Sequence, residues 1–176
     1  MILKDVLEKA KGIICDDEIN LEEDSKKRKK LIDCASLIYR ELTEQYIELK
    51  TKEKLYVEND KIYYSAFSKK VKDIISISKD GQKVGFKLLP TYLECVEKGE
   101  VEIKYVYNTD ELELTDEIIL PPPYTDNMLS MGIASEYFFR SGLIDEALFY
   151  KNRYDNALIN MSRRRNGFIL KERSFL

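Results

Sequence analysis

Histidine and tryptophan are both absent from this sequence of 176 residues, and cysteine occurs only three times. Catalysis by a nucleophile and a base normally uses an imidazole whose pKa lies near neutral pH, so Ser-His-Asp and Cys-His triads are excluded. Zinc sites of the Cys/His type are excluded too, because Cys15, Cys34 and Cys95 supply no C-x-x-C pair. Three well-separated cysteines predict reduced thiols, each buried as a small apolar side chain.

Phosphate-binding loops and calcium loops are also missing. Neither G-x-x-x-x-G-K-S/T nor G-x-G-x-x-G occurs in the sequence. The acidic residues between Asp16 and Asp24 lack the ligand spacing and the central glycine of a calcium loop, so we interpret them as a solvated linker before a helix. The sequence therefore predicts a protein that is not an enzyme, with no catalytic residues, no metal site and no cofactor.

Long apolar runs and a strong excess of one charge are lacking as well. Charged residues interrupt the N-terminal segment MILKDVLEKAKGII, and no stretch approaches the roughly 20 apolar residues of a membrane span. We therefore expect a protein made in the cytoplasm, with no membrane partner. The 29 basic and 32 acidic residues give a net charge of -3, so any contact with DNA must be local.

Apolar periodicity predicts two helices within residues 1–50. The first covers residues 2–10 and ends at Gly12. The second is a long helix whose apolar positions run from Leu31 to about Glu48, with its start in the acidic and basic run before Leu31. Carboxylates four residues before basic side chains support the start of this second helix. The expected i,i+4 pairs are Glu22–Lys26, Glu23–Lys27 and Asp24–Arg28.

The middle of the chain, residues 51–108, changes to short segments rich in Ile, Val, Tyr and Phe. Turn signals separate these segments, and the clearest is Asp80-Gly81, a pair that tolerates the positive φ of a tight hairpin turn. Residues 51–108 are therefore predicted to form an inserted antiparallel β module. The expected strands lie within residues 55–59, 61–67, 71–79, 83–90, 92–97 and 99–108.

Helical periodicity returns in residues 109–165, where Thr125 or Asp126 caps a helix that stops near Gly142. A second helix begins at Asp145, and the short connection predicts an antiparallel pair. The fold class is thus α+β: a small helical bundle, made of the long helix and the C-terminal helix pair, with an inserted antiparallel β-sheet module. The expected core contains Tyr137, Phe138, Leu148, Tyr154 and Leu158, packed against Leu31, Ile38 and Leu42.

Two short motifs each allow two interpretations. Lys26–Lys30 reads KKRKK, which is either a basic patch for nucleic acid or a solvated helix face that pairs with the preceding acidic run. Residues 121–124 read PPPY, which is either the P-P-x-Y form bound by polyproline-reading modules or a stiff lead-in that directs the next helix. In both cases we favour the structural interpretation.

The chain ends in a basic and apolar arm, residues 166–176, directly after three arginines. Arg163, Arg164 and Arg165 suit the negative C-terminal end of a helix. Chain ends are usually disordered unless they are tied down, yet this arm is capable of forming a strand and carries bulky side chains. Composition alone leaves two options open, which are burial on its own domain and burial on a neighbour.

The layout of the chain, a hairpin-rich sheet followed by a helix pair, resembles the head-to-tail adaptor proteins of tailed bacteriophages, which are the connector subunits beneath the portal. The resemblance covers nearly the whole chain, including a hairpin-rich sheet that ends in VEIKYVYNTDELELTDEIILPPP and the arginine cluster with its arm. It concerns residue types and their order, without a catalytic signature. The matching helical residues are Ala134, Glu136, Tyr137, Glu146, Ala147, Tyr150, Tyr154 and Ala157.

The resemblance implies a ring, commonly of about twelve subunits, that docks on the portal and continues the DNA channel toward the tail. It implies a virion protein of the head–tail neck that is assembled in the host cytoplasm. The implied partners are the portal protein, neighbouring copies, tail or other neck proteins, and packaged DNA through weak contacts only. Some adaptors carry sheet insertions that hold fibres, spikes or neck proteins, and the role of residues 51–108 stays open.

The arm supplies the expected partner-binding residues for the portal or a neighbouring subunit. The competing hypothesis is a small nucleic-acid-binding module that uses Lys26–Lys30 and Arg163–Arg165 to contact phosphate. The partner-binding set is Arg163, Arg164, Arg165, Phe168, Ile169, Leu170, Lys171, Arg173, Phe175 and Leu176.

Overall fold

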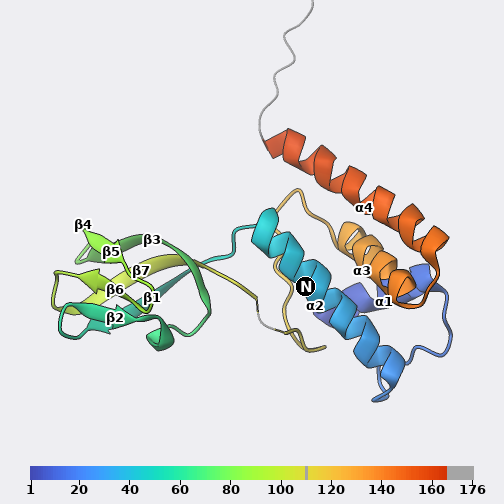
Figure 1. Cartoon of the computed structure of the whole chain (residues 1–176), viewed down its shortest axis with the longest axis horizontal. Helices are drawn as coiled ribbons and strands as arrows, with labels where there is room; N and C mark the ends of the chain where they lie inside the picture. Colours follow the sequence, from blue (N-terminus) through green and yellow to red (C-terminus); the bar gives the residue numbers. More distant parts are fainter. Residues whose placement is uncertain (110, 166–176) are drawn as a thin grey trace, which may run out of the picture. The chain divides into compact units, whose positions relative to one another are not determined.

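A computed structural model describes residues 1–109 and 111–165, with side chains as far as residue 161. The chain forms two compact units (Figure 1). The helical unit combines Met1–Tyr39 with the described residues from Glu111 onward, and the β unit spans Arg40–Asp110. Helices and two antiparallel sheets confirm the predicted α+β class with an inserted β-sheet module.

Helix α1, Leu3–Ile14, is longer than predicted because Gly12 does not end it. The glycine lies within the helix and is exposed, while Ile14 two residues later is buried and extends the apolar face. Cys15 ends the helix instead, with a φ of 53° and an N–H that donates to the carbonyl oxygen of Lys11. Cys15 is exposed, so the expectation that all three cysteines are buried was wrong for this one.

Helix α2, Lys26–Gln45, begins after the acidic run and not within it. Ser25 caps the helix, because its Oγ accepts a hydrogen bond of 3.1 Å from the backbone N–H of Arg28. The residues before it form turns, since Ile19 and Leu21 are buried and draw the segment onto the helical unit. The three predicted i,i+4 ion pairs were therefore wrong. The observed ion pairs are Lys27–Asp16, Lys27–Glu18, Lys29–Asp24 and Lys4–Glu22.

The β unit contains two antiparallel sheets where the sequence predicted one module without such a division. A four-stranded sheet has the order β1-β7-β3-β4, and a three-stranded sheet has the order β2-β6-β5. Asp80 and Gly81 have φ angles of 50° and 80° between the paired residues Lys79 and Gln82, which confirms the predicted hairpin turn. The strands are β1 Lys50–Val57, β2 Lys61–Tyr63, β3 Val71–Lys79, β4 Gln82–Val84, β5 Phe86–Leu88, β6 Tyr92–Cys95 and β7 Gly99–Tyr107.

A buried tyrosine organises the core of the β unit. Tyr105 of β7 is fully buried, and its ring packs edge-on against Phe67 at 4.9 Å between ring centres. The Tyr105 hydroxyl donates a hydrogen bond of 2.7 Å to the Glu53 carboxylate, which also accepts one from the Ser68 hydroxyl. This arrangement connects β1, β7 and the segment after the single 3-10 turn, Tyr64–Ala66, so the polar end of a buried ring is satisfied.

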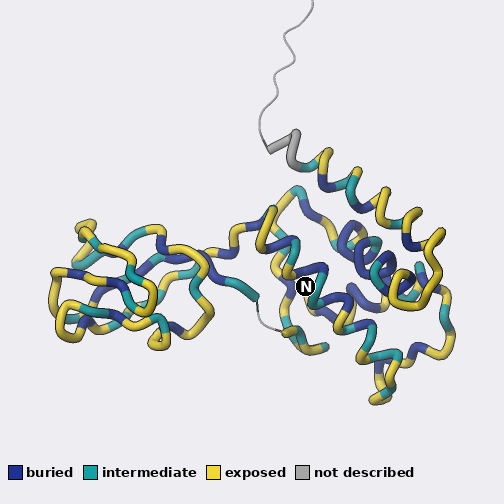
Figure 2. The backbone as a smooth tube through the Cα atoms, in the orientation of Figure 1, coloured by how far each residue is buried: buried dark blue, intermediate teal, exposed yellow. Residues whose placement is uncertain are grey.

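Helix α3, Asp126–Arg140, is the central helix of the helical unit (Figure 2). Thr125 caps it, since its Oγ1 accepts from the N–H of Met128. Small residues of α3 meet the other helices. Ser130 donates to the carbonyl of Val6 in α1, and a Cβ added to Gly132 would lie 2.9 Å from Cγ2 of Ile38 in α2.

Helix α4, Ile144–Arg165, packs on α3 after a turn at Gly142, whose φ is 78°. Ser135 of α3 donates to the carbonyl of Ala147, and Tyr154 lies 3.0 Å from the position of a Cβ on Gly132. The expected core is confirmed as buried except for Leu148, which is 56% exposed. The buried members are Leu31, Ile38, Leu42, Tyr137, Phe138, Tyr154 and Leu158.

The close packing at Gly132 predicts that Gly132→Ala lowers the free energy of unfolding by about 1–2 kcal/mol. The new methyl group overlaps Ile38 and Tyr154, and overpacking of this kind outweighs the gain in helix propensity. Gly12→Ala is the matched control, because no atom lies within 4 Å of its added Cβ and the substitution should stabilise α1. Urea unfolding of both variants measures the difference, and a Gly132→Ala variant as stable as Gly12→Ala contradicts the packing.

Replacing a buried leucine of α4 by alanine should destabilise the protein much more than replacing an exposed one. Leu158→Ala should cost about 2–5 kcal/mol of unfolding free energy, because Leu158 is 4% exposed. Leu148→Ala removes an exposed side chain and should cost less than about 0.5 kcal/mol. Thermal or urea unfolding of both variants tests the assignment, and equal losses would mean that α4 is rotated from the orientation described.

Candidate functional site

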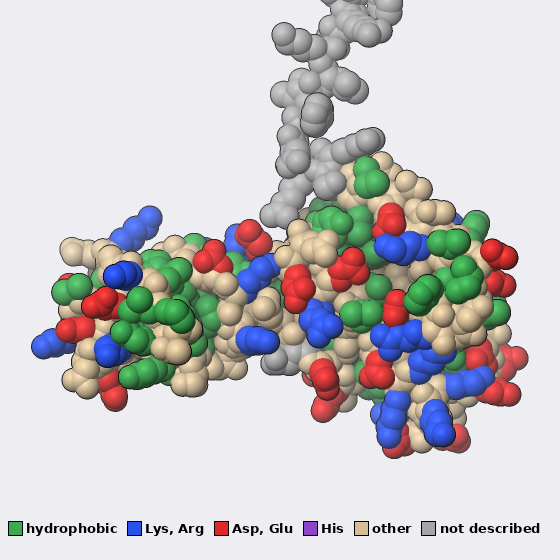
Figure 3. Space-filling model, in the orientation of Figure 1, with side chains coloured by type: hydrophobic (Ala, Val, Ile, Leu, Met, Phe, Trp, Pro, Cys, Tyr) green, Lys and Arg blue, Asp and Glu red, His purple; other side chains and the backbone are tan. Residues whose placement is uncertain are grey.

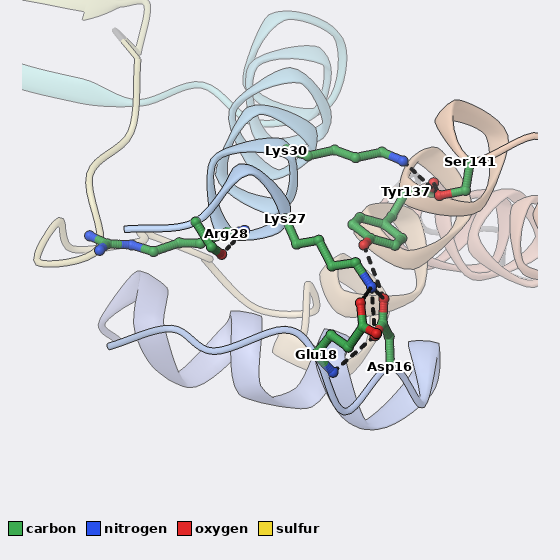
Figure 4. A network of polar contacts seen from close by, with 8 residues as sticks. Asp16, Glu18, Lys27, Arg28, Lys30, Tyr137 and Ser141 are labelled. Carbon is green, nitrogen blue, oxygen red and sulfur yellow. Dashed lines mark hydrogen bonds and ion pairs between the residues drawn. The ribbon is translucent and has the colours of Figure 1, made fainter. Parts of the chain in front are cut away.

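The acidic linker and the basic start of α2 meet in one cluster on the helical unit (Figure 4). The Nζ of Lys27 donates to Asp16 Oδ2 at 2.7 Å and to Glu18 Oε2 at 2.6 Å. The hydroxyl of Tyr137, from the C-terminal half of α3, lies 3.4 Å from the same oxygen of Asp16. We call these residues, together with Lys30 and Ser141, the charged cluster.

Lys30 connects α2 to the end of α3. Its Nζ lies 4.5 Å from the centre of the Tyr137 ring and donates a hydrogen bond of 2.6 Å to the Ser141 hydroxyl. The Ser141 hydroxyl in turn donates to the carbonyl oxygen of Tyr137 at 2.7 Å. The charged cluster therefore joins three segments that are far apart in the sequence: the loop after α1, the first turns of α2, and the end of α3.

Electrostatic coupling in the charged cluster shifts two ionisable groups in opposite directions. The hydrogen bond from Lys27 holds the pKa of Asp16 below its usual value, against the opposing effect of partial desolvation. The hydrogen bonds to Asp16 and Glu18 raise the pKa of Lys27. Both groups are consequently charged at neutral pH, and each already has its partner.

A cleft of about 610 Å³ opens beside the charged cluster, lined also by Ile14, Cys15 and Phe138. Asp16, Glu18 and Lys27 are occupied with one another, whereas Lys26, Asp17 and the exposed thiol of Cys15 also line the cleft. Lys27, Lys29 and Lys30 each contact another side chain of the helical unit, whereas the side chain of Arg28 points away from the cluster (Figure 4). The observed pairing favours a structural role for the charged cluster.

The second predicted motif, PPPY, is also part of the fold. Tyr124 is 8% exposed, and its backbone N–H donates to the carbonyl of Pro121 at 3.0 Å. A P-P-x-Y ligand needs an accessible tyrosine ring, so this burial supports the interpretation of residues 121–124 as a lead-in to α3.

The predicted partner-binding arm falls mostly beyond the described residues. Arg163, Arg164 and Arg165 form the last residues of α4, in agreement with the expected helix end, and their side chains are not described. The remaining members lie outside the described residues, so their assignment stays a prediction. They are Phe168, Ile169, Leu170, Lys171, Arg173, Phe175 and Leu176.

Sequence reasoning missed an apolar surface formed by the end of α3, the turn after it and α4. Ile144, Leu148 and Ile159 point away from α3, because they lie about 60–120° around the helix from the buried residues Tyr154 and Leu158. We call this surface the outer face of α4. It consists of Phe139, Leu143, Ile144, Leu148, Phe149 and Ile159, which are 46–62% exposed. The sequence did contain a signal for this surface, because α4 has more apolar residues than a single buried stripe of a helix can hold.

Charged side chains accompany the outer face, and two of them pair with each other. Lys151 contacts Asp155 at 2.9 Å on the same helix. The guanidinium of Arg153 lies 5.6 Å from the centre of the Phe149 ring and makes no ion pair among the described residues. Exposed hydrophobic side chains are visible among charged ones where α4 lies (Figure 3). The outer face is thus an apolar surface with a cation at its edge.

A second, smaller apolar surface lies where the N-terminus pairs with the segment that precedes α3. Ile2 forms an isolated antiparallel bridge with Glu117, and the N–H of Ile118 donates to the carbonyl of Met1 at 2.7 Å. Ile2 is 50% and Ile119 46% exposed. We call Ile2 and Ile119, with the exposed carboxylates Glu113 and Glu117, the bridge patch.

Comparisons with known proteins add no relative. No protein-family model matches the sequence. A search of curated proteins finds no significant match either.

Within the described residues, no helix has the length and apolar character needed to cross a membrane. In the same part of the chain, no three His, Cys, Asp or Glu side chains gather so that they could hold a metal ion.

The lowered pKa of Asp16 predicts an acid-sensitive contribution to stability. Because the folded-state pKa lies below the usual value of 3.8, the contribution is present above about pH 4 and is lost as the pH falls through the folded pKa. Asp16→Asn should therefore be less stable than the wild type at pH 7, and this difference should shrink toward pH 3. Urea unfolding at both pH values measures it.

Asp17→Asn is the control for this experiment, since Asp17 is exposed and has no described contact with Lys27. A difference between wild type and Asp16→Asn that stays constant between pH 7 and pH 3 would contradict the linkage.

Proposed function

We propose that this protein is a structural subunit of a bacteriophage neck, a head-to-tail adaptor. Copies of it form a ring beneath the portal and continue the DNA channel toward the tail, so its location is the virion. The observation that carries the proposal is the outer face of α4, a large apolar surface on a well-packed helical unit that no described element covers.

The size of the outer face supports a role in assembly. The outer face consists of six large apolar side chains, each about half exposed. Exposed apolar side chains that gather on one face commonly mark interaction sites, and a partner that covers them removes an aggregation hazard.

The other parts of the molecule fit this role. The arm, residues 166–176, supplies additional apolar and basic side chains for the portal or a neighbouring copy. The β unit is a second folded body, with its own buried core, that a tail or neck protein could recognise. Packaged DNA is expected to make weak contacts only, because the net charge of the chain is -3.

A nucleic-acid-binding module is the weaker alternative. Its first proposed contact, Lys26–Lys30, is largely occupied, since Lys27, Lys29 and Lys30 already have partners within the helical unit. Phosphate would have to displace these contacts before it gained a charge pair. The alternative retains Lys26, Arg28 and Arg163–Arg165, a smaller set than the sequence suggested.

Deleting residues 166–176 tests the adaptor proposal. The truncated protein should keep its helical circular dichroism and its melting temperature, because the proposal places the arm on the portal or a neighbouring copy. It should lose binding to the portal protein of the same phage, measured by light scattering or by co-sedimentation. The wild type should assemble with that portal protein and bind free DNA weakly.

Two results would overturn the proposal. The first is unfolding of the truncated protein, which would place the arm in its own core. The second is tight DNA binding by the wild type that weakens steeply with salt, together with no binding to the portal protein. The melting temperature of the truncated protein tests the first result. Sedimentation of the wild type with labelled duplex DNA at 50 mM and 200 mM salt tests the second.

A further inference from the structure

We propose that neighbouring copies contact each other head to tail, with the outer face of α4 on one copy against the bridge patch of the next. The inference rests on the proposed function because it identifies the surfaces that would build the ring. The contact itself requires only two copies of this chain.

Symmetry requires two different surfaces for such an assembly. A surface that binds itself closes a twofold dimer, whereas a closed ring needs a heterologous contact between two distinct patches. The described part of the helical unit exposes large apolar side chains at two places. One is the outer face of α4, and the other is the bridge patch with its neighbour Met1.

The charges around the two surfaces are complementary. The bridge patch carries exposed carboxylates, and Glu117, which is 78% exposed, pairs with the terminal amine of Met1 at 3.6 Å. Glu111 and Glu113 in the same segment are also exposed. The outer face carries Arg153, which lies over the Phe149 ring without an ion pair in the described chain. An Arg153–Glu117 or Arg153–Glu113 pair between copies would satisfy both surfaces.

Other charges of α4 do not oppose this pairing. Lys151 and Asp155 neutralise each other at 2.9 Å. Asp145 and Glu146 occupy the first turn of the helix, where the helix dipole favours carboxylates. Arg153 is therefore the charged residue of the outer face that can form an ion pair with a carboxylate of a neighbouring copy.

Mixing two blocked variants tests the contact directly. Leu148→Glu disables the outer face, and Ile119→Glu disables the bridge patch. Both residues are exposed, so both variants should keep the wild-type melting temperature. Sedimentation velocity should show larger species for the wild type as concentration rises and monomers for each variant alone. A 1:1 mixture of the variants should form a dimer that does not grow, since one intact surface of each kind remains to pair.

Charge exchange provides an independent test. Arg153→Glu and Glu117→Arg should each weaken self-association by about tenfold or more, and the double variant should recover most of the wild-type affinity. Lys83→Glu, an exposed lysine of β4 in the other unit, is the control for the change in net charge.

Several outcomes would overturn the head-to-tail contact. A mixture that stays monomeric rules out complementary surfaces, and dimerisation of Ile119→Glu alone indicates a twofold contact between outer faces. A wild type that remains monomeric near millimolar concentration, with and without the portal protein, also overturns it.

The test separates this contact from the proposed function. A mixed dimer without portal binding keeps the contact and removes the phage role. Portal binding without a mixed dimer keeps the role and removes the contact.

Discussion

The helical unit depends on the close approach of three helices at Gly132. At this position α3 has no side chain, and Ile38 of α2 and Tyr154 of α4 occupy the space where a Cβ would lie. Ser130 and Ser135 extend the same principle along α3, since their hydroxyls donate to backbone carbonyls of α1 and α4. Small residues on the central helix let the backbones come near enough for the larger side chains around them to interdigitate.

Local sequence signals predicted the elements and turns of this fold well. Asp80-Gly81 specified a hairpin because positive φ at two consecutive residues is a local requirement. The i,i+4 ion pairs before α2 were wrong for a physical reason: burial of Ile19 and Leu21 outweighs a few tenths of a kcal/mol per pair. The sequence could not predict that Leu148 is exposed. Periodicity shows on which side of a helix an apolar residue lies, but not whether another element covers that side.

The candidate site divides in the same way. Lys27 and Asp16 are eleven residues apart in the sequence, and only the fold of the acidic linker brings them to 2.7 Å. The outer face of α4 and the bridge patch can be identified only when the structure shows which apolar residues are buried and which are exposed. Composition led us to expect a partner-binding role for the C-terminal arm, which lies outside the described residues, so this role stays a prediction.

Pairing of β1 with β7 has a consequence for how the chain is organised. Lys50, at the start of β1, lies opposite Val106, near the end of β7, so the polypeptide enters and leaves the β unit side by side. Because the two ends of the β unit are held together, the insertion adds little to the entropy lost when the helical unit folds, much as a short turn would. The β unit can therefore be lengthened or replaced at little cost in chain entropy to the helices that flank it.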